Sequence, residues 1–259
     1  MERNKTRILC NKRRNKTDKK LQKLSDLLRK NKKCDIYIEK LKGEMLMSAQ
    51  VKSKKRVADH GEVFTNQREV NAMCDMVIQE TERIDSRFLE PACGDGNFLI
   101  EILKRKINIV KKKYKKSIYD YERFSLLAIS SLYGVELLED NVIACRKRLY
   151  DYWDKEYKTI SKKEYDEKVC NSAKFILEHN IVCGNALSLK CVDDKGNDID
   201  TPIIFSEWTF PFNDARIQRK DYTLDELVKR DMKQQEINEV NEEGKFLKQY
   251  ITHYKRLNN

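Results

Sequence analysis

Short apolar runs alternate with helical patterns over most of this chain, and that alternation limits its possible folds more than any other feature. Strand-like runs cover residues 87–93, 132–137, 181–185 and 202–208. Between them, apolar residues recur at the three- and four-residue spacing of amphipathic helices. Strands separated by helices form parallel sheets, because a parallel connection must cross back over the sheet. The sequence therefore predicts an α/β fold with a partial Rossmann-like sheet and helices on both faces.

The expected helices follow from this spacing and from capping residues. Asn66 and Glu69 match a capping box, and Asn97 can cap the helix after the first strand. A longer, charged helical segment is predicted from Thr223 to the C-terminus, with an interruption near Gly244. The earlier helices are predicted over 67–82, from 97 to about 110, over 119–130, from 139 to 153 and over 162–178.

Charge divides the chain into unequal parts. Residues 1–56 contain 20 Lys and Arg and 6 Asp and Glu, a net charge of +14, whereas the whole chain carries +11. We interpret 1–56 as a basic segment, partly disordered and partly helical, 57–215 as the main α/β domain and 216–259 as a charged C-terminal helical segment. Such a basic segment suits the phosphate backbone of a nucleic acid, and a solvated tail that aids solubility remains the alternative.

Composition and spacing exclude several other classes. The 8 glycines and 3 prolines are too few for a collagen-like or Pro/Gly-rich disordered chain. No apolar run approaches the roughly 18 residues of a membrane span, so no membrane contact is expected. The N-terminus lacks the apolar stretch of a secretory signal, which favours a cytoplasmic protein with reduced thiols. The eight cysteines form no C-x-x-C pair, and no spacing of His, Cys and Asp indicates a metal site.

The turn after the first strand is the most informative loop. Gly94 and Gly96 let the backbone turn with no Cβ in the way, so a ligand can lie against the peptide planes at a helix N-terminus. Glu90 can hold a cationic amine, and Phe98 can pack the helix on the sheet. Leu99 stands where the dinucleotide-binding fingerprint would need glycine. The alternative is an ordinary strand-to-helix turn with a surface glutamate.

Two further polar residues follow the next strands. Glu136 closes the second strand, where a carboxylate can accept hydrogen bonds from ribose hydroxyls. Asn185 follows the third strand, and its amide offers the donor and acceptor that suit an adenine edge. Each residue also has a simpler interpretation, a solvated acid at a strand end and an Asn in a turn.

Together these loops resemble those of S-adenosylmethionine-dependent DNA adenine-N6 methyltransferases of restriction–modification systems. Residues 90–99, Glu-Pro-Ala-Cys-Gly-Asp-Gly-Asn-Phe-Leu, match the first motif of that family in full. Residues 60–65, His-Gly-Glu-Val-Phe-Thr, are similar to the element ahead of its first strand, with Asn66 in place of a proline. Residues 184–187, Gly-Asn-Ala-Leu, are similar to its Gly-Asp-Ala-Leu. The resemblance covers roughly 58–190 and implies a class I methyltransferase fold, of which 57–215 would be the cofactor-binding domain.

The resemblance also implies roles for individual residues. Glu90 would hold the methionine amine, Glu136 the ribose, and Phe64 with Thr65 the methionine carboxylate. Double-stranded DNA would be the substrate and S-adenosylmethionine the methyl donor, with no metal. The implied cofactor-binding residues are Phe64, Thr65, Glu90, Pro91, Cys93, Gly94, Gly96, Phe98, Glu136 and Asn185.

The fourth strand departs from the family. Its members carry Asn/Asp-Pro-Pro-Tyr/Phe there, which binds and stacks the flipped adenine, whereas this chain has Ser-Glu-Trp-Thr-Phe over 206–210 and no adjacent prolines. Glu207, Trp208 and Phe210 could form an altered catalytic loop. The catalytic motif could instead lie on a second subunit, or the chain could be a degenerate copy without turnover. Trp208 and Phe210 could also simply cover the edge of a truncated sheet.

The sequence thus predicts an adenine-N6 DNA methyltransferase, or its cofactor-binding subunit, in a restriction–modification system. The alternative is a non-catalytic partner that binds DNA or the cofactor. Methylation of RNA or protein from the same cofactor site is a further alternative.

Overall fold

The computed structural model describes residues 56, 65–229 and 246–258. The expected basic segment over 1–55 and the resemblance at 60–64, which includes Phe64, lie outside the described residues. So do residues 230–245 of the expected C-terminal helical segment.

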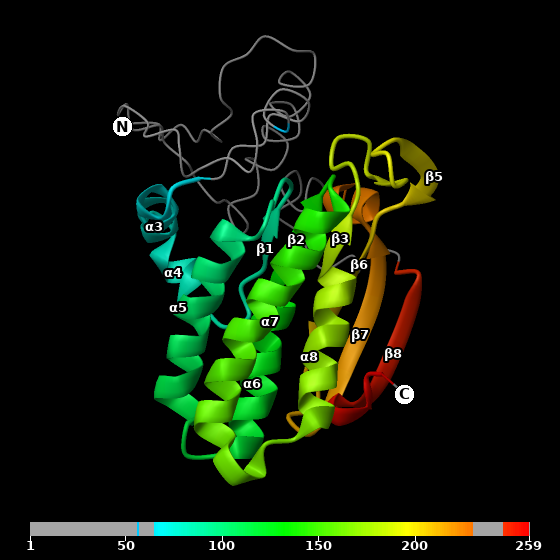
Figure 1. The fold of residues 1–259 in the computed structure, drawn as a ribbon. Coiled ribbons are helices and arrows are strands. Elements are labelled where there is room, and N and C mark those ends of the chain that lie inside the picture. Colours follow the sequence, from blue (N-terminus) through cyan, green and yellow to red (C-terminus); the bar gives the residue numbers. More distant parts are fainter. Residues whose placement is uncertain (1–55, 57–64, 230–245, 259) are drawn as a thin grey trace, which may run out of the picture.

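A three-stranded parallel sheet lies at the centre of the chain (Figure 1). It consists of β1 (Phe88–Glu90), β2 (Leu132–Glu136) and β3 (Ile181–Cys183), in the order β1-β2-β3. Glu90 pairs with Gly134, and Glu136 pairs with Cys183. The first three expected strands and their parallel arrangement are therefore confirmed.

The expected helices between these strands are also present. Ser117 and Asp166 cap two of them, each accepting a hydrogen bond from a backbone N–H in the first turn. The helices are α3 (Gln67–Asp75), α4 (Ile78–Thr81), α5 (Asn97–Tyr114), α6 (Ile118–Ser130), α7 (Glu139–Ser161), with the short η2 (Lys162–Glu164), and α8 (Glu167–Asn180).

Four of these helices form an up-and-down bundle that continues beyond the amino ends of the strands (Figure 1). Helices α5 and α7 begin at the carboxyl ends of β1 and β2, whereas α6 and α8 lead back into β2 and β3. The bundle interior is apolar and shares one core with Phe88, Leu132 and Ile181 of the sheet. Its largest buried side chains are Trp153, Tyr121 and Tyr157. Burial of this core is the main force that holds the helices on the sheet.

A second sheet corrects the expected topology. Strands β6 (Ile204–Thr209), β7 (Arg216–Thr223) and β8 (Lys248–His253) pair antiparallel in the order β6-β7-β8. The fourth expected strand exists as β6, but its backbone does not pair with a strand of the parallel sheet. A separate hairpin joins β4 (Lys190–Val192) to β5 (Asp198–Pro202).

The expected C-terminal helix is wrong for most of the part that is described. Only residues 224–229 are helical there, residues 248–253 form β8, and the short η3 (Tyr254–Arg256) follows. Residues 216–223, placed at the start of the helical segment, are β7. Apolar residues at 247, 251 and 254 fit a helical spacing, but pairing with β7 satisfies the backbone of this stretch as a strand.

The prediction of helices on both faces of the parallel sheet is only partly confirmed, because the helical bundle covers one face and a strand with a short helical segment covers the other. Tyr133 and Val135 face away from the bundle and form a second apolar cluster with Ile203, Phe205 and Leu224. The Tyr133 and Phe205 rings meet edge to face, with centroids 5.3 Å apart. The Tyr133 hydroxyl donates to the Ser206 carbonyl at 3.0 Å. Strand β6 and the helical residues 224–229 thus cover this face.

Buried charges join the pieces of the fold. The Glu122 carboxylate on α6 accepts hydrogen bonds from Tyr157 and Tyr254, each at 2.6 Å, and lies 3.0 Å from the Lys255 ammonium. These partners come from α7 and η3, so one carboxylate ties the end of the chain to the bundle. At the amino ends of the strands, the fully buried Lys106 donates to the carbonyls of residues 84 and 86 and to the Ser131 hydroxyl. Burial lowers the pKa of Lys106 to about 7.

Within the part of the chain that is described, no helix has the length and apolar character needed to cross a membrane.

Replacing Tyr254 by Phe tests the Glu122 network. The substitution keeps the buried ring but removes one donor from a buried carboxylate, which should lower the free energy of unfolding by about 1–3 kcal/mol. Urea denaturation measures the change, with Tyr119→Phe as the matched control because Tyr119 is 40% exposed. Equal stability of Tyr254→Phe and the unsubstituted chain would contradict a stabilising role for this hydrogen bond.

Candidate functional site

The turn from β1 to α5 has the backbone shape that its glycines suggest. Gly94 and Gly96 adopt φ values of 53° and 88°, and the Gly96 N–H donates to the Cys93 carbonyl at 2.8 Å. A Cβ on Gly96 would lie 2.7 Å from the Cys145 sulfur of α7, so glycine is required by space as well as by φ. The predicted cap, Asn97, is instead the first residue of α5: Gly96 occupies the N-cap position, and no side chain caps this helix N-terminus. Its first N–H groups therefore face the carboxyl edge of the sheet, where an anionic group could bind.

Glu136 holds this turn against the neighbouring strand. One of its carboxylate oxygens accepts from the Gly94 N–H at 2.9 Å, and the other accepts from the Leu138 N–H at 3.0 Å. The acid at the end of β2 therefore orients the turn before α5 and the entry to α7. Each oxygen keeps a second lone pair for a ligand hydroxyl.

Glu90 is the second acid at this edge. It ends β1, its side chain is partly buried, and Glu136 is close enough to add charge repulsion. Burial, with a smaller contribution from Glu136, raises the pKa of Glu90 to about 7, against a hydrogen bond from the Ala92 backbone that lowers it. A cationic ligand beside this acid would stabilise its ionised form and lower its pKa toward the usual value.

Three other expected contact residues pack rather than face the edge. Cys93 is buried and interacts with the Cys145 thiol, and a Cβ on Gly134 would come within 2.8 Å of the Cys93 sulfur. The Cys145 contact and burial raise the pKa of Cys93 well above its usual value. Phe98 packs against the bundle core. Pro91 lines a small apolar hollow of about 10 Å³, too small for a nucleoside, together with Leu89, Val135, Ala186, Leu189, Leu224 and Val228.

Thr65 reaches the edge through its backbone. Asn97, which the sequence analysis named only as a helix cap, and Arg148, which it did not select, hold Thr65 there. The Asn97 amide donates to the Thr65 carbonyl at 3.3 Å. Arg148 on α7 donates to the Asn97 side-chain oxygen at 2.7 Å and lies 3.2 Å from the Asp95 carboxylate. No local motif marks Arg148, because its partners lie about fifty residues away on another element.

Asn185 has both halves of its amide engaged. Its nitrogen donates to the Asp198 carboxylate at 2.8 Å, and its oxygen accepts from the Leu187 N–H at 3.0 Å. The residue therefore holds its own turn beside the β4–β5 hairpin. Contact with an adenine edge would require exchange of the Asp198 bond.

The structure does not bring Glu207, Trp208 and Phe210 to this edge. Glu207 pairs with Arg87, just before β1, and the Trp208 indole donates to Asn180, just before β3, at 3.1 Å. Phe210 lies under the Arg123 guanidinium, 5.2 Å from ring centroid to cation. Because Arg87 and Asn180 precede β1 and β3, Glu207 and Trp208 lie toward the amino ends of the parallel strands, away from the glycine turn. The three residues proposed for an altered catalytic loop are instead engaged in an ion pair, a hydrogen bond and a cation–ring contact away from the glycine turn.

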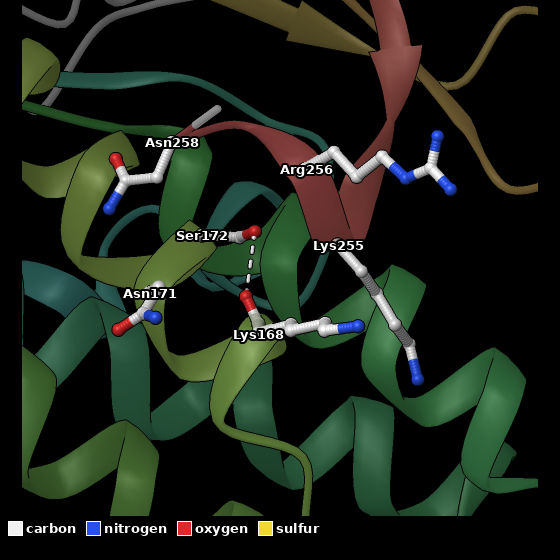
Figure 2. Close-up of a pocket in the computed structure, with 6 residues that line it drawn as sticks. All are labelled: Lys168, Asn171, Ser172, Lys255, Arg256 and Asn258. Atoms are coloured by element: carbon white, nitrogen blue, oxygen red, sulfur yellow. Dashed lines mark hydrogen bonds between the residues drawn. The ribbon is translucent and has the colours of Figure 1, made fainter.

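A larger hollow, of about 120 Å³, lies between α8 and η3. Figure 2 shows that the charged ends of its cations do not converge, since Arg256 extends away from Lys168 and Lys255. Lys255 already pairs with Glu122 and Asp166, each at 3.0 Å. The hollow is lined by Lys168, Asn171, Ser172, Lys255, Arg256 and Asn258, and it is separate from the glycine turn. Among the described residues, no group of three or more His, Cys, Asp or Glu is placed to hold a metal ion.

The raised pKa of Glu90 predicts a stability change with pH. Because the folded state holds this proton up to about pH 7 while the unfolded chain releases it near 4.5, folding stability falls as pH rises between those values. Glu90→Gln removes that loss and should raise the free energy of unfolding by up to about 3 kcal/mol at pH 8, with little change at pH 4. Denaturation at both pH values measures it, with exposed Glu82→Gln as the control. A Glu90→Gln effect independent of pH would contradict the interpretation.

Comparison with known proteins gave no match to a protein-family model, to a curated protein or to a solved structure.

Proposed function

We propose that this chain is a methyltransferase-type subunit that binds S-adenosylmethionine at the carboxyl edge of its parallel sheet and acts on DNA with a second, catalytic subunit. The supporting observation is the placement of Glu90 and Glu136 on neighbouring strands, on either side of a glycine turn that opens α5. Ligands of open α/β sheets bind at this edge, so the position suits a nucleoside.

The charges of the edge match those of the proposed ligand. Glu90 offers a carboxylate to an ammonium group, and its raised pKa indicates that it lacks a cationic partner of its own strength. Glu136 has lone pairs left for ribose hydroxyls after binding Gly94 and Leu138. The uncapped first turn of α5 offers N–H groups to a carboxylate. When bound, the cofactor would supply an electrophilic methyl group without a metal.

The positions of the three residues proposed for catalysis favour a second subunit. Adenine methylation needs acceptors and an aromatic ring beside the exocyclic amine of a flipped base. Glu207, Trp208 and Phe210 are held toward the opposite ends of the strands by Arg87, Asn180 and Arg123. We therefore assign target-base binding to another chain. The net charge of +14 over residues 1–56 supports a nucleic acid as the shared substrate.

The main alternative is a partner without turnover that binds DNA or the cofactor. The same placement of Glu207, Trp208 and Phe210 favours it, because a chain with no catalytic role needs no base-binding loop near the turn.

Isothermal titration with S-adenosylmethionine tests the cofactor site. The unsubstituted chain should bind, and Glu90→Gln should weaken binding by roughly 10- to 100-fold, because a charge-assisted hydrogen bond is lost while the fold is kept. Glu164→Gln, at an exposed acid in η2 (Lys162–Glu164), is the control and should bind normally. Absence of binding by the unsubstituted chain at millimolar ligand would refute the proposed cofactor site.

Methyl transfer to duplex DNA tests the need for a second subunit. The chain alone should form no N6-methyladenine, and activity should appear when a protein that carries an Asn-Pro-Pro-Tyr-type loop is added. Detection of N6-methyladenine by mass spectrometry measures both arms. Methylation by the chain alone would overturn the two-subunit proposal, and cofactor binding with no methylation in either arm would favour the non-catalytic alternative.

A further inference from the structure

The glycine turn of the proposed cofactor site has little intrinsic rigidity. Two glycines with positive φ lie within three residues, and glycine loses more conformational freedom on ordering than any other residue. The strand side of the turn is held by Glu136 and by the Cys93 N–H, which donates to the Val135 carbonyl at 3.0 Å. On its helix side the Gly96 N–H donates to the Cys93 carbonyl at 2.8 Å, and a second restraint comes from outside the turn.

Arg148 supplies that restraint from α7. Its guanidinium lies 3.2 Å from the Asp95 carboxylate and donates to the Asp95 carbonyl at 3.5 Å and to the Asn97 side-chain oxygen at 2.7 Å. It therefore contacts the centre of the turn and the first residue of α5 at once. All three contacts are made by one guanidinium nitrogen, Nη1, so a single charged group joins the turn to the start of α5.

Asn97 extends the restraint to a third segment. Its oxygen accepts from Arg148 while its nitrogen donates to the Thr65 carbonyl at 3.3 Å. Arg148 thereby orients the Asn97 amide, and the amide holds Thr65 ahead of α3. Arg148 of α7 thus contacts the turn and α5 directly, and through Asn97 it is linked to Thr65, two residues before α3.

We propose that Arg148 is a positioning residue of the cofactor site, which orders the Asp95–Asn97 turn and, through Asn97, the Thr65 backbone before a ligand binds. The inference rests on the proposed function. Ordering a loop before binding raises affinity, because that ordering no longer opposes association. Arg148 also neutralises Asp95, which leaves Glu90 and Glu136 as the acids that act on a cationic ligand.

The test measures both affinity and local order in the full chain. Arg148→Gln should weaken S-adenosylmethionine binding by roughly five- to ten-fold, with Arg148→Lys in between because it keeps the positive charge on a side chain of different length and shape. Lys147→Gln is the matched control, since the adjacent Lys147 is exposed and pairs with Asp151 one turn further along α7. Combining Arg148→Gln with Asn97→Ala should give less than the product of the two single effects, because both act through one contact.

Amide hydrogen exchange on the ligand-free chain separates positioning from general stabilisation. In Arg148→Gln, the Gly94 and Gly96 amides should exchange faster while amides in the middle of α7 and the melting temperature stay unchanged. Faster exchange throughout α7, or unchanged exchange at the turn, would overturn the proposal, as would unaltered cofactor affinity. If the unsubstituted chain binds no cofactor, the proposed function fails, and exchange at the turn still decides whether Arg148 orders it.

Discussion

The carboxylate of Glu136 is the contact on which the carboxyl edge of the sheet depends. It accepts one N–H from the turn after β1 and another from the residue before α7, so a single side chain at the end of β2 orients the start of two helices. The strands themselves are short, three residues in β1 and β3 and five in β2, and offer few ladder bonds to do this. In the proposed site the same two oxygens would also bind the ligand. Ligand binding would therefore depend on the contacts that orient the turn and the start of α7.

Local signals explain why much of this edge could be predicted from the sequence. Glu90, Gly94 and Gly96 belong to one continuous strand–turn–helix segment, so their neighbourhood in space follows from their neighbourhood in the chain. Glu136 could be placed because parallel strands bring their carboxyl ends to one edge. The helices likewise followed from apolar spacing and from capping residues such as Asn66.

Features set by tertiary contacts could not be predicted in the same way. An apolar run indicates a strand but not its direction, so the sequence predicts the run around Phe205 in the parallel sheet, whereas it pairs antiparallel with β7. Residues 248–253 became a strand because β7 pairs with them, which their helical spacing does not reveal. Arg148 and Lys106 lie on ordinary helical patterns, and their roles come from partners on other segments.

The two ends of the parallel strands carry side chains of opposite charge, Lys106 at the amino ends and Glu90 at the carboxyl ends. Burial disfavours the charged form of each. At the amino ends, Lys106 directs its ammonium at carbonyl oxygens, and burial brings its pKa down to about 7. At the carboxyl ends, burial raises the pKa of Glu90 to about 7. The contribution of Glu90 to folding stability falls as pH rises from 4.5 to 7, because the folded chain keeps a proton that the unfolded chain has released. The contribution of Lys106 rises with pH from 7 to 10.5, because the unfolded chain then binds a proton that the folded chain has released. These two groups together therefore contribute least to the stability of the ligand-free fold near neutral pH. A cation bound beside Glu90 would stabilise its carboxylate and so recover the stability that burial of this acid costs.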